Sequence, residues 1–204
     1  MLPRITTPMV QPLRLAGSAK DFLQKVNRVG RDILKMTQSW NELRFPEMHV
    51  AAIRLYDLGF RNESTYWSYS PQYRGRQFAS LVDQDKMGSM GAPAFELVQA
   101  ANAFQQLDGP YINGYAFGDI NRLAQIVQRV QKDNEAVPAL GKLYPGVIFK
   151  RQSDWNAGNE SLNQGLIKFL SVLKEQKNSL KKTRVENGTE AKFSKLTNKE
   201  FPDR

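Results

Sequence analysis

The element that decides the fold runs from residue 18 to residue 44 and reads SAKDFLQKVNRVGRDILKMTQSWNELR. Its apolar side chains recur at alternating four- and three-residue steps, the spacing of one face of an α-helix. The spacing predicts a helix of about seven turns with a continuous apolar stripe, which we call the interaction helix. The stripe consists of Phe22, Val26, Val29, Ile33, Met36, Trp40 and Leu43.

The opposite side of the interaction helix is basic, because Arg28, Arg31 and Lys35 fall there by the helical period. One interpretation is a helix that binds a core or a partner with its apolar face and an anion with its basic face. The other is an ordinary amphipathic helix whose charged face is solvated. Three heptads could also form a coiled-coil dimer.

Four further helices are expected along the chain. Proline in the first turn and glycine at the end delimit one helix between Pro46 and Gly59. Periodic apolar residues predict others over 92–107, from the capping residue Asp119 to before Pro138, and from about 161 onward. The sequence therefore predicts an all-α fold of about five helices.

Three segments interrupt this helical pattern. Residues 60–78 lose the helical period and contain Pro71 and Gly75, which indicates a long loop. Residues 111–117 carry the dipeptide Asn113–Gly114, which favours the tight turn of a small hairpin. Residues 144–151 are compatible with a short strand. The expected organisation is an extended arm over 1–17, one helical globular domain over 18–175 and a basic flexible tail over 176–204.

The net charge of +9 is confined to the two ends of the chain. Residues 1–44 carry eight basic and three acidic side chains, and residues 174–204 carry nine and five. The stretch between them has twelve of each sign. A neutral globule with basic extensions is expected to meet something acidic.

The absence of cysteine excludes disulfides, thiolate metal sites and cysteine nucleophiles, and it is compatible with a reducing compartment or a virion. The first twenty residues contain no acidic side chain, and mitochondrial targeting segments are likewise poor in acidic residues. Pro3, Pro8 and Pro12 disfavour the amphipathic helix that such a segment needs, so an extended arm is the preferred interpretation.

Aromatic and basic residues gather in the predicted loop at 60–78. Rings stack on nucleobases and guanidinium groups fork onto phosphates, which would suit a single-stranded nucleic acid. The same composition also suits a loop that packs its aromatic rings on a helical core and leaves its tyrosine hydroxyls in contact with solvent. The candidate nucleic-acid contacts in this loop are Arg61, Tyr66, Trp67, Tyr73, Arg74 and Arg76.

The basic tail supplies a second set of candidate contacts, Lys177, Lys181, Lys182 and Arg184. Neutralising several phosphates would give binding with a steep salt dependence and no sequence preference. The tail carries only scattered apolar residues, so we expect it to lack structure of its own. The alternative is a solvated tail of mixed charge.

Signals for an enzyme are weak, and we predict no catalytic residue, no cofactor and no metal site. His49, the only histidine, has neither a metal-binding partner nor a triad around it in sequence. No phosphate-binding glycine motif is present. A helical cell-wall hydrolase, resembling a muramidase in its use of a lone glutamate, is the alternative function, with Glu63 or Glu47 as the acid.

These observations favour a non-enzymatic structural or interaction protein of a larger nucleoprotein or virion-like assembly. Its expected partners are other protein subunits, together with nucleic acid or another acidic partner. A third function is a peripheral membrane protein that docks on anionic lipid through residues 18–44. No apolar run approaches the roughly 18 residues that span a bilayer.

Overall fold

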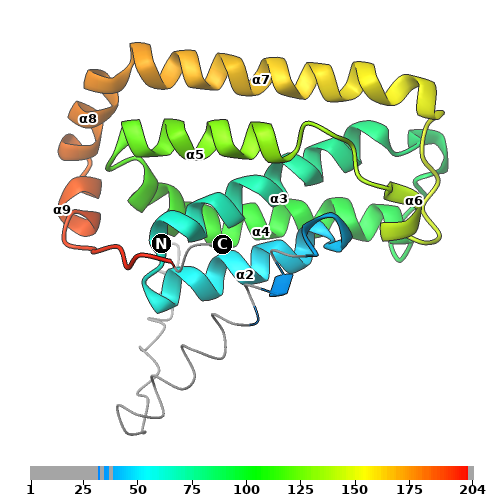
Figure 1. Ribbon diagram of the computed structural model, residues 1–204, viewed down its shortest axis with the longest axis horizontal. Helices are drawn as coiled ribbons and strands as arrows, with labels where there is room; N and C mark the ends of the chain where they lie inside the picture. The colour runs from blue at the N-terminus through cyan, green and yellow to red at the C-terminus, as the bar shows by residue number, and fades with distance from the viewer. Residues whose placement is uncertain (1–31, 33–34, 37–38, 202–204) are drawn as a thin grey trace, which may run out of the picture.

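The structure of the chain is a computed structural model, and it describes residues 32, 35–36 and 39–201. Over these residues the chain forms one compact all-α body, as the sequence predicts (Figure 1). The described residues contain eight α-helices, where about five are expected from the sequence. They are α2 (Phe45–Leu58), α3 (Arg61–Leu81), α4 (Pro93–Ala116), α5 (Ile120–Asp133), α6 (Leu140–Leu143), α7 (Trp155–Glu175), α8 (Lys177–Glu186) and α9 (Thr189–Phe193). The 3₁₀-helices are η1 (Trp40–Glu42), η2 (Gln84–Lys86) and η3 (Gln152–Asp154).

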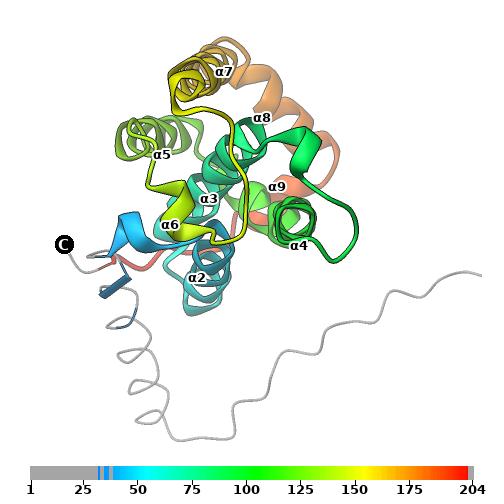
Figure 2. The ribbon, with the colours of Figure 1, turned by 90° about the vertical axis from the view of Figure 1, so that its right-hand side faces the viewer.

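Helix α3 is the centre of the body, and it contacts α2, α4, α5 and α7. Figure 2 shows this arrangement end-on, with α2 below α3, α4 and α5 on either side of it and α7 above. In Figure 1, α7 runs along the top of the body, and α8 and α9 descend along one end. The outer helices therefore form a shell around a single central helix.

Helix α2 confirms the prediction made from its terminal residues. Pro46 lies in its first turn, and Gly59 ends it in the left-handed region at φ 92°. Glycine is the residue that adopts this conformation without a steric penalty. Apolar residues at helical spacing, Met48, Ala52 and Leu55, are fully buried against α3 and its neighbours.

The predicted loop at 60–78 is wrong, because these residues form most of α3. Thirteen of the 21 residues of α3 are buried, and they lie on every side of the helix. A helix enclosed on all sides has no polar stripe, so its sequence lacks the alternation that marks a surface helix. Pro71 and Gly75 are accommodated inside it; a Cβ at Gly75 would lie 3.3 Å from the Cβ of Ala101 on α4.

The predicted hairpin at 111–117 is also wrong, because α4 continues through Asn113 and Gly114 to Ala116. Tertiary contacts account for this. The hydroxyl of Tyr69 donates to the Asn113 side chain at 2.9 Å, and Ile112 is buried in the core. Gly114 packs directly under the ring of Phe193. These contacts outweigh a local preference for a turn.

Helix α5 confirms both its predicted cap and its predicted stripe. The Asp119 carboxylate accepts a hydrogen bond from the backbone N–H of Arg122 at 3.0 Å. The five buried residues of α5 are those of the stripe, Ile120, Leu123, Ile126, Val127 and Val130. Helix α7 begins at Trp155, six residues before the predicted start.

The expectation that the tail lacks structure is wrong for residues 177–193, which form α8 and α9. Two side chains hold these helices to the body. Arg184 donates to the carbonyl of Gly114 at 2.7 Å, and Phe193 is buried against the same residue. A single arginine and a single aromatic ring thus supply anchors that a count of apolar residues overlooks.

Most of the interaction helix, including Phe22, Val26, Val29 and Ile33, lies outside the described residues. Met36 and Leu43 pack against the core around α2 and α3. The predicted end of this helix at Arg44 is wrong, because Trp40–Glu42 form η1 and Arg44 is extended. Arg44 instead begins α2, and its side chain pairs with Glu47 at 2.6 Å.

The segment 144–151 does not form the expected β-strand, although Phe149 makes an isolated antiparallel bridge with Val82. The ring of Phe149 packs edge-on against Phe78, and this contact joins the segment to the end of α3. No helix among the described residues is long and apolar enough to cross a bilayer.

Candidate functional site

The structure separates the predicted nucleic-acid contacts into buried and exposed groups. Tyr66 and Trp67 are 0 % exposed, and Tyr73 and Arg74 are each 4 % exposed. These four side chains are part of the core around α3, so they offer no surface on which a base could stack. Arg61 is half-buried, whereas Arg76 is exposed.

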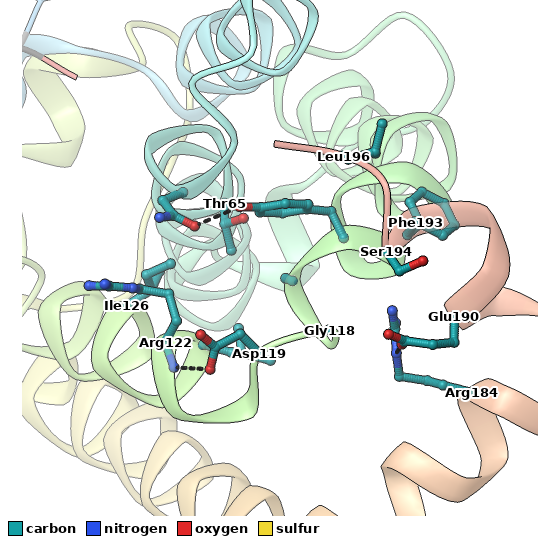
Figure 3. Close-up of a pocket in the computed structure, with 14 residues that line it drawn as sticks. Thr65, Gly118, Asp119, Arg122, Ile126, Arg184, Glu190, Phe193, Ser194 and Leu196 are labelled. Atoms are coloured by element: carbon teal, nitrogen blue, oxygen red, sulfur yellow. Dashed lines mark hydrogen bonds and ion pairs between the residues drawn. The ribbon is translucent and has the colours of Figure 1, made fainter. Parts of the chain in front are cut away.

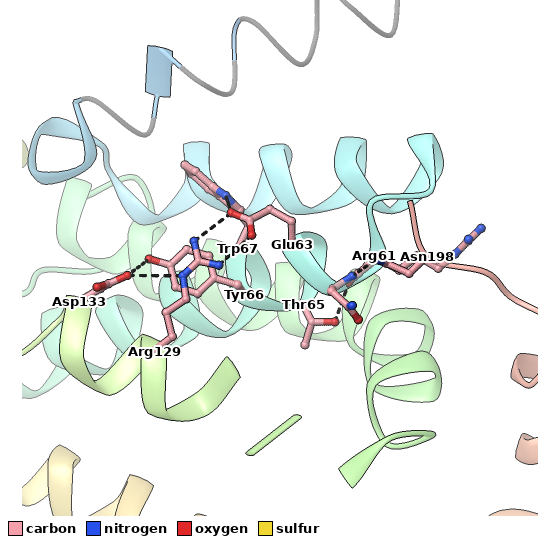
Figure 4. Close-up of polar contacts among 9 residues, drawn as sticks. Arg61, Glu63, Thr65, Tyr66, Trp67, Arg129, Asp133 and Asn198 are labelled. Atoms are coloured by element: carbon pink, nitrogen blue, oxygen red, sulfur yellow. Dashed lines mark hydrogen bonds and ion pairs between the residues drawn. The ribbon is translucent and has the colours of Figure 1, made fainter. Parts of the chain in front are cut away.

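A polar cluster at the first turns of α3 explains why its charged and aromatic residues are internal (Figure 4). Arg129 of α5 donates to both carboxylate oxygens of Glu63, at 2.8 and 3.1 Å. The indole N–H of Trp67 donates to the same carboxylate at 3.1 Å, and the Tyr66 hydroxyl donates to Asp133 at 2.6 Å. The cluster therefore joins α3 to α5.

The electrostatics of this cluster are those of a structural ion pair. The guanidinium carbon of Arg129 lies 3.5 Å from the centre of the Tyr66 ring. Burial alone would lower the pKa of Arg129, but the hydrogen bonds and negative charge of Glu63 outweigh it and raise that pKa.

The two glutamates of the hydrolase alternative are both occupied by arginines. Glu63 is held by Arg129, and Glu47 by Arg44 in the first turn of α2. A general acid must carry a proton that it can deliver to substrate. The geometry around these residues therefore gives the hydrolase no support.

Arg74 has a structural role as well. Its Nε donates to the Asn134 side chain at 2.9 Å, and its Nη1 donates to the carbonyl of Leu43 at 3.2 Å. Burial lowers the pKa of this arginine. Arg74 thus connects α3 to the end of α5 and to the segment that precedes α2.

Arg61 belongs to the contact between α3 and the C-terminal segment. Its guanidinium donates to the carbonyl of Thr197 and lies 5.4 Å from the centre of the Tyr56 ring. The side chain of Asn198 accepts a hydrogen bond from the first-turn N–H of Asn62 at 2.9 Å. The C-terminal segment therefore caps the start of α3.

His49 lies in the core, where its Nδ1 is 3.0 Å from Oδ2 of Asp108. Its ring is stacked on Phe104 with 4.9 Å between centroids, and the hydroxyl of Ser68 donates to the same carboxylate oxygen at 3.3 Å. The three helices α2, α3 and α4 meet at this pair.

The C-terminal region presents a different kind of surface. Its lysines are exposed, and we call them the C-terminal lysines. They are Lys174, Lys177, Lys181, Lys182, Lys192, Lys195 and Lys199. Arg184, in contrast, is 7 % exposed, and its Nε pairs with Glu190 at 3.0 Å. Of the four predicted contacts here, the three lysines face solvent and the arginine does not.

A cavity of about 300 Å³ lies between α3, the start of α5 and α8–α9 (Figure 3). Two of its lining residues, Arg122 and Arg184, are basic, and two, Asp119 and Glu190, are acidic. The acids are engaged, because Asp119 caps α5 and Glu190 pairs with Arg184. The charges at this cavity are balanced.

A second hollow, of about 390 Å³, lies between α3, α4 and α7. We call it the aromatic groove. Its walls include Tyr69, Tyr73, Arg76, Phe117, Leu166 and Phe169. The α3 residues are spaced as one helical face, and this signal is readable only once residues 60–78 are recognised as helix. Phe117 and Phe169 come from the end of α4 and from α7, and no local signal in the sequence places them beside α3.

Comparisons with known proteins find no relative. A scan against protein-family models finds no match, and searches of curated proteins and of solved structures find none either. What the chain does must therefore be inferred from its own geometry.

Proposed function

We propose that the chain is a non-enzymatic interaction protein of a larger assembly, and that its C-terminal lysines bind nucleic acid through the phosphate backbone. One observation carries the proposal. All seven lysines between 174 and 199 are exposed, while Arg184, the arginine among them, has internal partners.

The kind of basic residue at the surface indicates the kind of binding. Lysine carries a mobile point charge, whereas arginine supplies the rigid fork that reads a guanine edge or clamps one phosphate. An exposed set made of lysines therefore supports attraction without sequence preference. The interaction would be dominated by counterion release and would weaken steeply as salt rises.

The spacing of the lysines on α8 is compatible with a phosphate chain. Lys177 and Lys181 are one turn apart, about 6 Å along the axis. A DNA strand carries one charge per about 3.4 Å of helix axis, so neighbouring lysines can meet successive or alternate phosphates. The nearby contacts of Lys177 with Asn121 and of Lys182 with Glu186 are solvent-exposed and weak enough to yield.

The test is a titration of labelled single- and double-stranded oligonucleotides between about 50 and 200 mM salt. We compare the full chain with a variant in which Lys177, Lys181 and Lys182 are all changed to glutamine. The slope of log K against log salt is expected to shrink by about 2 to 3 in the variant, because about 0.9 counterion is released per neutralised phosphate.

The control removes the same charge from elsewhere on the surface, by changing Arg54, Lys86 and Lys142 to glutamine. These residues are exposed on other elements, and the slope should stay close to that of the parent chain. Equal losses in both variants would mean that only net charge matters. Absence of binding by the parent chain at low salt would reject nucleic acid, and anionic vesicles and acidic proteins would then be tested as partners.

A further inference from the structure

The aromatic groove has the size and chemistry of a ligand site rather than of a packing defect. Its volume of about 390 Å³ is within the usual range for small-molecule sites. Tyr69 and Phe169 are stacked at an interplanar angle of 19°, and Phe117 lies beside Phe169. Arg76 supplies a basic group to the lining.

The tyrosines of the groove are fixed in place by their hydroxyl groups. The Tyr69 hydroxyl donates to Asn113 at 2.9 Å, and the Tyr73 hydroxyl lies 2.9 and 3.0 Å from Oδ1 of Asn159 and Asn163. Because its side chain is only 4 % exposed, Tyr73 supports the groove wall and does not itself provide a stacking face. Rings held in this way lose little conformational entropy when a ligand binds. The groove is therefore preorganised for a flat apolar group.

The chemistry of the lining selects the class of ligand. Aromatic and aliphatic walls suit a planar ring, and an exposed guanidinium suits an anion attached to it. A nucleotide combines these two features. The rise along α7 from Leu166, in the groove, to Lys174, the first C-terminal lysine, is about 12 Å. A strand bound by the lysines can thus reach the groove.

We propose that the aromatic groove binds an unpaired nucleobase of a single-stranded nucleic acid, with Arg76 contacting its phosphate. This inference rests on the proposed function and adds to it a preference for single-stranded over double-stranded nucleic acid. The lysines attract any polyanion, whereas the groove requires a base that is free of a duplex. Single strands should therefore bind more tightly than duplexes of equal length.

The experiment fills the groove. A Cβ at Gly165, which lines it, would meet no atom within 4 Å, so this position has open space for the first atom of a larger side chain, and Gly165→Leu is the chosen variant. The affinity for a labelled oligothymidylate should fall about tenfold, the scale of one lost base–aromatic stack, and the affinity for a duplex should stay unchanged. Arg76→Ala should also weaken the single strand more than the duplex.

Two variants serve as matched controls. Gly141→Leu adds the same side chain at another exposed glycine with open space, and Arg54→Ala removes another exposed arginine. Both should leave the preference for single strands unchanged. Photo-crosslinking with a bromouracil-substituted strand should mark peptides of α3, α4 or α7 that line the groove.

The possible results separate this inference from the proposed function. If the parent chain binds single and double strands equally, and Gly165→Leu changes neither, the groove is not a base site while the lysine interface stands. Crosslinks confined to α8 and residues 192–199 would also reject the groove as a base site. If the parent chain binds no nucleic acid at low salt, both proposals fail together.

Discussion

Helices α3 and α8 both carry several basic residues, but they use them in opposite ways. In α3, Arg74 is buried and bonded to Asn134 and to a backbone carbonyl, within a helix of which 13 residues are buried. In α8, Arg184 is the single buried residue, and the lysines face solvent. Composition alone does not tell a binding surface from a polar core.

The division follows from the chemistry of the two cations. A guanidinium offers five donors in a plane, so it can enter the protein interior where enough acceptors surround it. An ammonium group is more strongly hydrated and stays at the surface. Arg74, Arg129 and Arg184 thus hold helices together, whereas the C-terminal lysines lie at the surface, where a partner can meet them. Changes at Arg74 or Arg129 should therefore cost stability, and changes at the C-terminal lysines should cost binding.

The largest effect on stability is expected from Trp67→Ala. The indole is fully buried and donates to Glu63, so its removal leaves a large cavity and an acceptor with one donor fewer. The free energy of unfolding should fall by about 4 kcal/mol, measured by urea denaturation. Ile167→Ala on α7, where the side chain is 47 % exposed, is the control and should cost less than about 1 kcal/mol.

The next effect concerns the ion pair that joins α3 to α5. Arg129→Gln should lower the free energy of unfolding by about 3 kcal/mol, because the Glu63 carboxylate, 11 % exposed, loses both hydrogen bonds from the guanidinium. Lys182→Gln breaks the ion pair with Glu186 at the surface of α8 and should change stability by less than about 0.5 kcal/mol. Similar losses of unfolding free energy in the two variants would contradict the distinction between the internal ion pair of α3 and α5 and the surface ion pair of α8.

The attachment of α9 to α4 can be tested through one glycine. A Cβ at Gly114 would overlap the ring of Phe193, so Gly114→Ala should destabilise the chain by about 2 kcal/mol. Gly109→Ala on the same helix is the matched control, since its Cβ would be 3.7 Å from the nearest atom and should be tolerated. Limited proteolysis should show earlier cleavage in α8–α9 for the first variant only.

A separate effect is expected only at high pH. Burial raises the pKa of Tyr73 and of Tyr144 to about 12, above the value near 10 in the unfolded chain. The folded state thus holds these protons more tightly, and this stabilisation is complete below pH 10 and is lost as pH rises toward 12. Urea midpoints should fall over that window, and Tyr73→Phe should reduce the fall. Tyr111→Phe, at a side chain 53 % exposed, serves as the control.

Local signals in the sequence were sufficient for the helices that have a solvated face. Pro46 and Gly59 delimit α2, and Asp119 with its periodic stripe defines α5. Local signals failed for α3, because its buried residues lie on every side of the helix and leave no contrast between an apolar and a polar face. They also failed at Asn113–Gly114, where contacts with Tyr69 and Phe193 are remote in sequence and decide the conformation.

The candidate site was predictable to a similar extent. Lys177, Lys181 and Lys182 were identified because a lysine run needs no tertiary context to be exposed. The fates of Tyr66, Trp67 and Arg74 depended on partners such as Asp133 and Asn134, which lie some 60 residues away in the chain. The aromatic groove combines three helices, and no single segment of the sequence contains its pattern.

The C-terminal lysines are proposed to meet the partner, while the internally bonded Arg74 and Arg129 hold the fold. Lysine acetylation footprinting, read by mass spectrometry with and without a bound oligonucleotide, tests this proposal most directly. Lys177, Lys181 and Lys182 are expected to be protected by the oligonucleotide, while Lys86 and Lys142 react at unchanged rates. Protection spread evenly over all five lysines, or confined to Lys86 and Lys142, would contradict it.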